Sequence, residues 1–534
     1  MLAALRRRPA AVAFAAIAVI FVLTRLALLW RFPPFVDESL YAFWSKEIHD
    51  SDQNRFVPLA NGRLPLLPWL GAVIVWLGAA PLTAVRLVST GSGLVSLASV
   101  GWLGRRLGGT WTGVAAAGLY VVVPYFVVHD VIGIYEPLVI ACAMVALCLE
   151  VRLAEEPRLD VSLLLGLALG AGVLTKKSGL FAVVLLPLSL LCFRWHEPRR
   201  RLRLARFAGG ALLALAIAGA MFSILKLSEH YAILFRTADQ TEAIRSVGAG
   251  LAHPLRWIEF AWPGERTHIL GYVTPPLVVL AAIGLGLALR RRWPFPAFLV
   301  LWAIVPLAAS TLLAETIFAR WTLWVAPPLA VFAAFALVRL LRAAATLPFA
   351  RPLLASAGAV AVALVLLPAF ILDGHVLADP NRAHYPGYSD VEYATGWAAG
   401  NAWRAVAGEL NRLAGSGRAT VTVFALGSPA LGLFLHPNVV QEDGVDSHYV
   451  IENGEPLPVS HGPGELRPIW EYRRPRRGTP LELFERGVTV GGRFYGSPGD
   501  LRAGLGLDDK GFDRFVNTHP AVRAWYDAAV ADGQ

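Results

Sequence analysis

The chain has 534 residues, of which 56% are hydrophobic and only 16% are charged, and its mean hydropathy is +0.54. This composition excludes an ordinary soluble globule and predicts an α-helical polytopic membrane protein. The net charge of +10 does not indicate a nucleic-acid-binding protein, because the Lys and Arg residues form short clusters between apolar segments, as in the loops of membrane proteins. The three cysteines all fall inside apolar segments, so neither a disulfide framework nor a metal site is predicted from them.

The first apolar run covers residues 10–30 and follows Arg6, Arg7 and Arg8. It looks like a signal peptide, but it is long enough to span a bilayer, which takes about 20 residues, and no small-residue cleavage site follows it. We therefore predict an uncleaved first helix with its N-terminus in the cytoplasm. An adjacent pair of carboxylates, Asp37-Glu38, then lies just outside the membrane.

Ten further apolar runs are predicted as membrane spans, which makes about eleven in total. The shorter apolar run at 69–80 has only about a dozen residues, fewer than the ~17 that a span needs, and is predicted to be a re-entrant or interfacial helix. The ten further spans are 82–103, 111–128, 131–149, 161–174, 180–193, 207–225, 270–289, 295–313, 321–340 and 353–372.

The basic clusters support this count. With the N-terminus in the cytoplasm, the clusters at 105–106, 152–158, 194–206, 290–292 and 339–351 all fall in cytoplasmic loops, as the positive-inside rule requires. Counting 69–80 as a full span would reverse the orientation of every one of them.

The same topology gathers the remaining polar residues at segment ends on the outer surface, whereas a transporter more often places ionisable groups near the midplane of the bilayer. Arg and Lys at the head-group level suit a lipid-borne phosphate, whose charge they stabilise as it leaves. A nearby carboxylate suits a general base that takes the proton of an acceptor hydroxyl. These residue types predict sugar transfer from a polyprenyl phosphate outside the membrane. The residues concerned are Asp37, Glu38, Arg63, His129, Asp130, Glu136, Lys176, Lys177 and Arg320.

Several short motifs occur in order along residues 1–341. They are Asp37-Glu38 with Tyr41, Gly62-Arg63-Leu64-Pro65 with Trp69, Ala84-Val85-Arg86-Leu87, His129-Asp130, residues 166–172 leading into Leu174-Thr175-Lys176, and Ala319-Arg320-Trp321 with Pro327. This ordered combination resembles the GT-C glycosyltransferases. The most similar branch is the protein-mannosyltransferase and aminoarabinose-transferase type, glycosyltransferase families 39 and 83.

The resemblance implies roles for four residues. Asp37 corresponds to the catalytic carboxylate of the first outer loop. Arg63 lies where the family usually has a phosphate-binding Lys or Arg, although the usual Lys-Pro-Pro reads Arg-Leu-Pro here. Lys176 matches the cation of a Leu-Thr-Lys motif near the lipid phosphate, and Arg320 matches the Arg of an Arg-Tyr motif, here Arg-Trp. The resemblance also implies inversion, because a single displacement needs one base and no enzyme nucleophile.

Alternatives stay open at the other candidates. The second acidic position of the family corresponds either to Asp130, which we assign as catalytic, or to Glu136. Glu38 is either a second catalytic carboxylate or a helix cap. Lys177 either contributes to phosphate binding or snorkels at a helix end.

Three residues are assigned to substrate binding, namely Tyr41, His129 and Glu136. His129 has no His or Cys partner at metal-ligand spacing, so its role as a ligand is left open. No cofactor is predicted to be required, and the involvement of a divalent cation is also left open.

The composition changes after residue 372 to that of a soluble domain. Because it follows an odd number of spans, we expect it outside the membrane. Helical patterning at 400–413 and strand-like runs at 419–425, 448–451 and 481–484 predict a small α/β domain. The predicted domains are thus a GT-C-like membrane domain, 1–372, and an extracytoplasmic domain, 373–534. In the linking stretch, the aromatic rings of Tyr385-Pro386-Gly387-Tyr388 either stack on sugar or pack against the bundle.

The sequence therefore predicts a multi-pass glycosyltransferase of the bacterial cytoplasmic membrane. Its expected partners are a polyprenyl-phosphate sugar, the lipid bilayer and a glycan, lipid or protein acceptor of the cell envelope, with no nucleic acid. A lipid-linked-sugar flippase or transporter and a non-catalytic binding scaffold are the alternatives from other classes. An oligosaccharyltransferase is the nearest enzymatic rival, but its Trp-Trp-Asp motif is absent from the sequence.

Overall fold

The computed structural model of the chain describes residues 9–236, 245–292, 294–345, 351–424, 428–441, 447–453, 464–478 and 480–531. The chain divides into two units. The first comprises Met1–Phe32 and Tyr41–Ser389, and the second comprises Pro33–Leu40 and Asp390–Gln534. The short segment that carries Asp37 and Glu38 is therefore grouped with the C-terminal part of the chain. The sequence-based boundary at residue 373 falls inside helix α20, which ends at Ala378.

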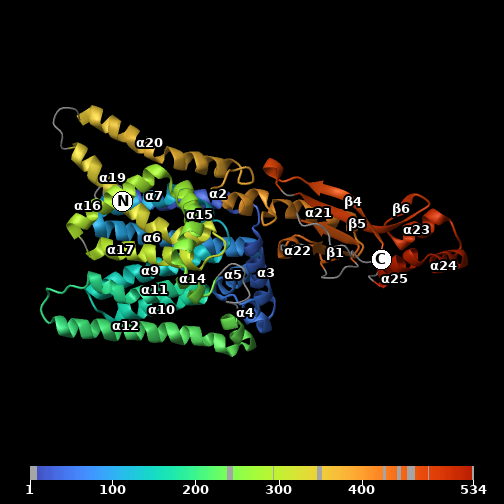
Figure 1. Cartoon of the computed structure of the whole chain (residues 1–534), viewed down its shortest axis with the longest axis horizontal. Helices are drawn as coiled ribbons and strands as arrows, with labels where there is room; N and C mark the ends of the chain where they lie inside the picture. The colour runs from blue at the N-terminus through green and yellow to red at the C-terminus, as the bar shows by residue number, and fades with distance from the viewer. Residues whose placement is uncertain are drawn as a thin grey trace. The chain divides into compact units, whose positions relative to one another are not determined.

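Helices make up nearly all of the first unit (Figure 1). Its short helices are α4 (Val57–Ala60), α8 (Pro124–His129), α11 (Leu180–Leu185), α13 (Ile233–Arg236), α14 (Val247–Ala252) and α18 (Ala319–Thr322). Its longer helices are α2 (Pro9–Leu29), α3 (Val36–Asp50, which begins in the second unit), α5 (Leu66–Trp76), α6 (Pro81–Gly108), α7 (Thr110–Val122), α9 (Tyr135–Glu155), α10 (Leu159–Thr175), α12 (Arg200–Ser223), α15 (Pro254–Val273), α16 (Pro275–Arg292), α17 (Pro294–Leu313), α19 (Ala326–Ala345) and α20 (Arg351–Ala378).

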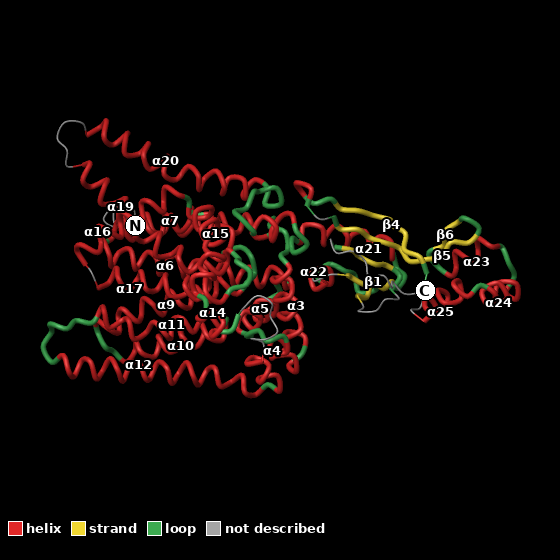
Figure 2. Tube along the Cα trace, in the orientation of Figure 1, coloured by secondary structure: helices red, strands yellow, loops and turns green. Residues whose placement is uncertain are grey.

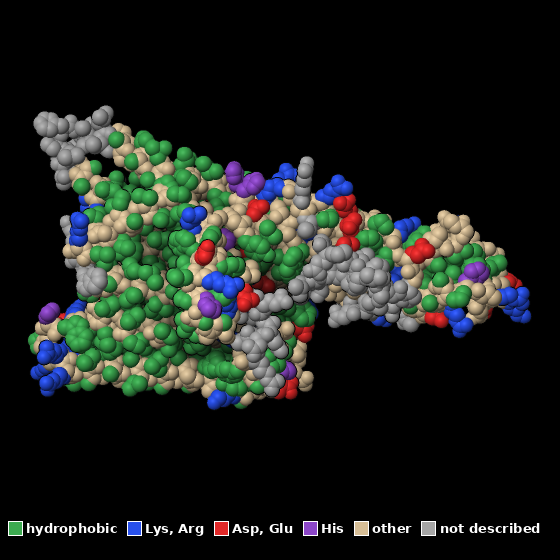
Figure 3. Space-filling view, in the orientation of Figure 1, with side chains coloured by type: hydrophobic (Ala, Val, Ile, Leu, Met, Phe, Trp, Pro, Cys, Tyr) green, Lys and Arg blue, Asp and Glu red, His purple; other side chains and the backbone are tan. Residues whose placement is uncertain are grey.

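Among the described residues, seven helices are long and apolar enough to cross a membrane, or up to eight when the bent pair α15–α16 is counted as one span. Shorter apolar helices occupy the other predicted spans, at Thr110–Val122, Leu159–Thr175 and Lys177–Cys192. The face of the bundle seen in Figure 3 is largely hydrophobic, as expected of a surface that contacts lipid. The prediction of a helical polytopic membrane protein with a small C-terminal α/β part is confirmed.

One region agrees with the prediction in detail, and three others differ from it. Helix α5 has 11 residues, which agrees with the prediction of a helix too short to span. No helix is predicted between the runs 10–30 and 69–80, yet Val36–Asp50 forms α3. The stretch between the predicted spans 207–225 and 270–289 contains α13, α14 and most of α15, while residues 237–244 lie outside the described part of the chain. The predicted span 270–289 is broken, because α15 and α16 meet at 94° around Thr274, whose φ is +72°, just before Pro275.

Small residues allow two of these helices to approach closely. Gly166 and Gly170 are one turn apart on α10 and face α12. A Cβ on Gly166 would lie 3.0 Å from the carbonyl oxygen of Ala214, and a Cβ on Gly170 would lie 2.4 Å from the sulfur of Met221. This spacing of small residues is the usual device for close helix packing inside a bilayer.

The second unit contains a mixed sheet, whose strands are yellow in Figure 2. The strand order is β2-β1-β3-β5-β4, with β6 paired to β5. β1 is parallel to β2 and β3, whereas β3, β4 and β6 are antiparallel to β5. The strands are β1 (Ala419–Phe424), β2 (Val439–Gln441), β3 (Tyr449–Glu452), β4 (Glu465–Tyr472), β5 (Leu481–Val490) and β6 (Arg493–Tyr495). The helices are α21 (Trp403–Ala414), α22 (Ser428–Gly432), α23 (Pro498–Leu505), α24 (Asp509–Thr518) and α25 (Pro520–Ala531).

This unit has two hydrophobic cores. In the first, the apolar face of α21, with Trp403 and Leu410, packs on the sheet. In the second, Trp525 of α25 and Phe512 of α24 pack against the far end of β5 and β6. The predicted helix and three predicted strands all correspond to observed elements, although residue 425 lies outside the described residues.

A buried arginine joins the sheet region to the stretch before α21. Arg474 is 3% exposed and donates hydrogen bonds to Asn453 Oδ1, at 2.6 Å, and to the carbonyl oxygen of Ala399. Burial lowers the pKa of Arg474 to about 10, which leaves it charged at neutral pH. Loss of this side chain would leave two buried acceptors without a donor, which costs about 1–3 kcal/mol for each group.

We expect Arg474→Met to lower the free energy of unfolding of the second unit by about 2 kcal/mol or more. The matched control is Arg473→Met, because Arg473 is the next residue, is 83% exposed and pairs only at the surface with Glu471. Pulse proteolysis of the full-length protein in detergent across a urea series would measure both. Equal sensitivity of the two variants would contradict this assignment.

Candidate active site

The predicted acidic pair lies in the first turn of α3, where the positive end of the helix dipole favours carboxylates. Glu38 is fully buried, and its Oε1 accepts a hydrogen bond of 2.9 Å from the backbone N–H of Phe35. This contact is the side-chain-to-backbone half of a capping box, the alternative that the sequence left open for Glu38. Asp37 is half-buried. The two adjacent carboxylates therefore have different environments.

The backbone that precedes Asp37 is fixed by residues of its own unit. Phe35 forms a β-bridge with Ala399, and its ring meets that of Tyr393 edge-on at 5.3 Å. A Cβ on Gly400 would lie only 1.6 Å from the carbonyl oxygen of Pro34, so this close approach requires glycine. Because Ala399 also accepts from the buried Arg474, the position of the acidic turn depends on the C-terminal part of the chain.

A cluster of opposite charges lies inside the first unit. Glu136 begins α9, Lys176 directly follows α10 and Arg320 lies on α18. Glu136 Oε1 is 2.5 Å from Lys176 Nζ and 3.8 Å from Arg320 Nε. The carboxylate side chain is 5% exposed, and those of Lys176 and Arg320 are 26% and 11% exposed. The structure thus brings together two predicted phosphate ligands and one predicted acid from three helices.

Arg63 and Lys177 extend this positive region. Both side chains are exposed, and Arg63 is close enough to Lys176 and Lys177 to interact electrostatically with each. The turn before Arg63 requires glycine, because Gly62 has a φ of +64°. All four predicted cations of the phosphate site therefore belong to the first unit. Arg63 and Arg320 each interact electrostatically with Lys176.

A group of aromatic side chains begins beside Arg320. Its guanidinium lies 4.4 Å from the ring centre of Phe318, in the geometry of a cation–π contact. Phe318 in turn contacts Trp321 at 5.0 Å and Tyr388 at 5.7 Å. Tyr388 belongs to the Tyr385-Pro386-Gly387-Tyr388 stretch, so this stretch packs on the bundle beside Arg320. The packing alternative for its aromatic rings is thereby observed for Tyr388.

Asp130 occupies a different position from the cluster around Glu136. It is 2% exposed, its Oδ2 is 3.4 Å from Arg25 Nη2, and its Oδ1 accepts a hydrogen bond from Tyr120 Oη at 3.1 Å. Gly93 makes room for it, because a Cβ there would lie 2.6 Å from the carboxyl carbon. These contacts are those of a structural ion pair that joins α2 to the α8–α9 turn.

His129 and Tyr41, both predicted to bind substrate, are also buried. His129 is fully buried, and its Nδ1 donates to the carbonyl oxygen of Tyr125 at 2.8 Å. It interacts electrostatically with Glu136 and Arg320, so it borders the charged cluster. Tyr41 is 4% exposed, and its ring lies 4.3 Å from that of Tyr135.

Two buried residues of α15 were not singled out from the sequence. Glu265 is fully buried, and its Oε2 accepts from Thr311 Oγ1 at 2.8 Å. His268 is 1% exposed, and neither ring nitrogen has a hydrogen-bond partner in the described part of the chain. The spacing of three residues between them puts both on one face of a helix, but the sequence predicts no helix in this region.

No group of three or more His, Cys, Asp or Glu residues is arranged to hold a metal ion within the described residues. The charged groups brought together here are Lys176 and Arg320 around Glu136. Lys and Arg side chains can donate hydrogen bonds to phosphate oxygens and stabilise their charge.

Residues 61–224 match the sequence profile of a family described as dolichyl-phosphate-mannose-protein mannosyltransferase. This stretch includes Arg63, Glu136 and Lys176. No curated protein matches the chain.

Several solved structures share the fold. Apo ArnT from Cupriavidus metallidurans is 18% identical and has a TM-score of 0.55, over 81% of this chain and 85% of that one. The same protein bound to undecaprenyl phosphate is 18% identical, with a TM-score of 0.54 over 81% and 86% of the two chains. The oligosaccharyltransferase AglB from Archaeoglobus fulgidus, in complex with an inhibitory peptide and a dolichol-phosphate, is 14% identical, with a TM-score of 0.51 over 84% and 69%. Identities this low establish a common fold only.

The buried ion pair of Arg25 and Asp130 allows a test of whether Asp130 has a structural or a catalytic role. We expect Asp130→Asn to lower the free energy of unfolding by about 3 kcal/mol or more, because Arg25 would remain buried without its carboxylate. The double variant Arg25→Met with Asp130→Leu, which removes both charges, should recover much of that loss and keep its activity per folded molecule. Unfolding in detergent and transfer activity would be measured on the same samples. A stable but inactive double variant would instead support the catalytic assignment made from sequence.

Proposed function

We propose that this chain, which has the fold of the GT-C membrane glycosyltransferases, transfers a sugar from a polyprenyl-phosphate donor to an acceptor on the outer face of the cytoplasmic membrane. The observation that carries the proposal is the convergence of Lys176 and Arg320 on Glu136, from three separate helices. Two cations around one carboxylate leave an excess of positive charge that a phosphate would neutralise. The match of residues 61–224 to a mannosyltransferase family that uses a lipid phosphate supports the same donor class.

In the proposed reaction, Arg63, Lys176 and Arg320 bind the donor phosphate, with Lys177 at the edge of the site. The acceptor hydroxyl attacks the anomeric carbon while the bond from that carbon to the phosphate oxygen breaks. Asp37 accepts the proton of the hydroxyl, and polyprenyl phosphate leaves with its charge stabilised by the cations. A single displacement of this kind inverts the anomeric configuration. Glu38, which caps α3, supports the turn that carries Asp37.

The proposed orientation follows from the positive-inside rule. The basic clusters between predicted spans lie on the cytoplasmic side, and the polar segment ends with Asp37 and Lys176 lie on the outer side. In this arrangement the protein is a multi-pass protein of a bacterial inner membrane, with its C-terminal α/β part outside. The acceptor is a glycan, lipid or protein of the envelope.

A flippase for a lipid-linked sugar is the second candidate, because it would use the same cations to hold a phosphate. It would need no base, however, and this difference allows a direct test.

We expect Asp37→Asn to reduce sugar transfer by about a hundredfold or more, the usual effect of losing a general base, while binding of the donor is retained. Transfer would be assayed with purified protein in nanodiscs and a panel of radiolabelled polyprenyl-phosphate sugars. Asp50→Asn is the matched control, because Asp50 lies at the other end of α3 in an exposed pair with Lys46. Undiminished sugar transfer in Asp37→Asn would reject Asp37 as the general base, and flipping without transfer in both proteins would reject the transferase.

The excess positive charge predicts an unusual effect at Glu136. We expect Glu136→Gln to bind polyprenyl phosphate about tenfold more tightly. Without the carboxylate, Lys176 and Arg320 would both pair with the ligand's phosphate, and a charge-assisted interaction is worth about 1.5–3 kcal/mol. Slower product release should then lower the turnover number. Glu155→Gln serves as the control, because Glu155 pairs with Arg106 at the opposite end of α9. Weaker binding in Glu136→Gln would show that the carboxylate chiefly positions the cations.

A further inference from the structure

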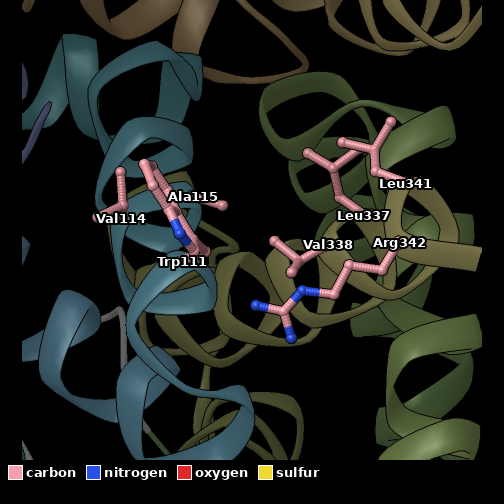
Figure 4. Close-up of a pocket in the computed structure, with 7 residues that line it drawn as sticks. All are labelled: Trp111, Val114, Ala115, Leu337, Val338, Leu341 and Arg342. Carbon is pink, nitrogen blue, oxygen red and sulfur yellow. The ribbon is translucent and has the colours of Figure 1, made fainter. Parts of the chain in front are cut away.

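A second site lies at the far end of α19 from Arg320. A pocket of about 390 Å³ opens between the start of α7 and the end of α19 (Figure 4), within the size range usual for small-molecule sites. From α7 it is lined by Trp111, Val114 and Ala115, and from α19 by Leu337, Val338, Leu341 and Arg342. We call this site the α7–α19 groove.

The groove is distinct from the proposed phosphate site. Arg342 is sixteen residues beyond the first residue of α19, which places it about 24 Å farther along the helix at 1.5 Å per residue. Arg320 lies before that helix begins. A ligand in the groove would therefore be separated from the cluster around Glu136 by most of the thickness of a bilayer.

The lining combines an apolar trough with one cation at its edge. Six of the seven lining side chains are nonpolar, and the small side chain of Ala115 leaves the space that the larger ones enclose. Figure 4 shows Arg342 extending its guanidinium toward Trp111. Arg342 is exposed and takes part in no hydrogen bond or ion pair within the described residues. The guanidinium is therefore available to an external anion.

The position of the groove relative to the membrane surface follows from its residues. Trp111 is 47% exposed at the first turn of α7, and Arg342 lies in the last turn of α19. Trp and Arg are both favoured where a helix leaves the hydrocarbon layer. α6 ends with Arg105 and Arg106 immediately before α7 begins. The mouth of the groove is therefore at a strongly basic membrane surface, while its apolar walls continue into the hydrocarbon.

We propose that the α7–α19 groove is a binding site for an anionic phospholipid of the surrounding bilayer. The phosphate oxygens of the head group accept hydrogen bonds from Arg342, and one acyl chain lies along Val114, Val338 and Leu341. Anionic head groups are attracted to basic residues at the membrane surface, and the planar guanidinium matches the geometry of a phosphate. A lipid bound in this way bridges α7 and α19, two helices that pack together.

The test is lipid binding by the delipidated full-length protein in detergent, measured by native mass spectrometry. Dioleoyl phosphatidylglycerol and dioleoyl phosphatidylcholine would be titrated separately, because they share acyl chains and differ in net charge. We expect tighter binding of phosphatidylglycerol by the unaltered protein. Arg342→Gln should weaken it by about fivefold, the effect expected of one Arg at an anionic surface, and so remove the preference.

Two further variants complete the test. Arg201→Gln is the control for charge, because Arg201 is an exposed residue of the first turn of α12 and does not line the groove. Ala115→Phe fills the trough and should lower the binding of both lipids while Arg342 is retained. If Ala115→Phe does not accumulate, Leu341→Asn takes its place, since Leu341 is 42% exposed and tolerates a polar side chain.

Several results would overturn the proposal. If the unaltered protein bound the two lipids equally, Arg342 would have no role in selecting an anionic head group. If Arg342→Gln and Arg201→Gln lost the same amount of phosphatidylglycerol binding, the preference would come from the general positive charge of the surface. A dimer that dissociates in Ala115→Phe would assign the groove to a second copy of the chain. Competition by polyprenyl phosphate at this groove would assign it to the donor lipid. None of these readouts depends on sugar transfer, so the proposed function and this site can fail separately.

Discussion

The constraint on which the membrane unit depends is the high cost of leaving a charge unpaired inside an apolar helical bundle. Arg25 satisfies this constraint by forming an ion pair with Asp130. Arg86 satisfies it by donating hydrogen bonds to the carbonyl oxygens of Leu29, at the end of α2, and of Phe32. The cluster around Glu136 differs, because one carboxylate faces both Lys176 and Arg320. The first arrangement pairs opposite charges, the second satisfies a guanidinium with backbone carbonyls, and both hold helices together. The third has an excess of positive charge, which is the property that a phosphate-binding site needs.

Much of the fold was predictable because the hydrophobic effect and the length of a span leave few choices. Long apolar runs correspond to helices, the short run at 69–80 corresponds to the short helix α5, and the C-terminal part contains the predicted helix and strands. The bend between α15 and α16 was not predicted. Apolar length cannot reveal it, since it depends on Thr274, whose backbone is left-handed, and on the proline that follows. The helices α13, α14 and α15, which precede this bend, were not predicted, because the charged residues in that stretch obscure the apolar face of each helix.

The residue types of the candidate site could be predicted from the sequence, but not which acidic residue pairs with which basic residue. Lys176, Arg320 and Glu136 stood out as polar residues at the ends of apolar segments, and the structure brings them together. Asp130 stood out on the same ground, yet it pairs with Arg25, whose position inside the first apolar run gave no sign of a partner. Which acid meets which cation depends on the order of the helices in the bundle, and hydropathy carries no information about that order. His268 and Glu265 were missed for a related reason, since burial in a helix is invisible when the helix itself is not predicted.

The acidic pair shows how local geometry separates two adjacent carboxylates. In a helix, neighbouring residues point in directions about 100° apart, so Asp37 and Glu38 cannot act on the same atom in the same way. Glu38 is turned toward the backbone of Phe35 and is fully buried, while Asp37 remains half-buried. The motif is therefore not a catalytic pair of equivalent acids. The proposed single displacement needs only one base, and Asp37 is the less buried of the two carboxylates. The bridge between Phe35 and Ala399 then gives the C-terminal unit a part in the proposed chemistry, because it holds the turn on which that base is carried.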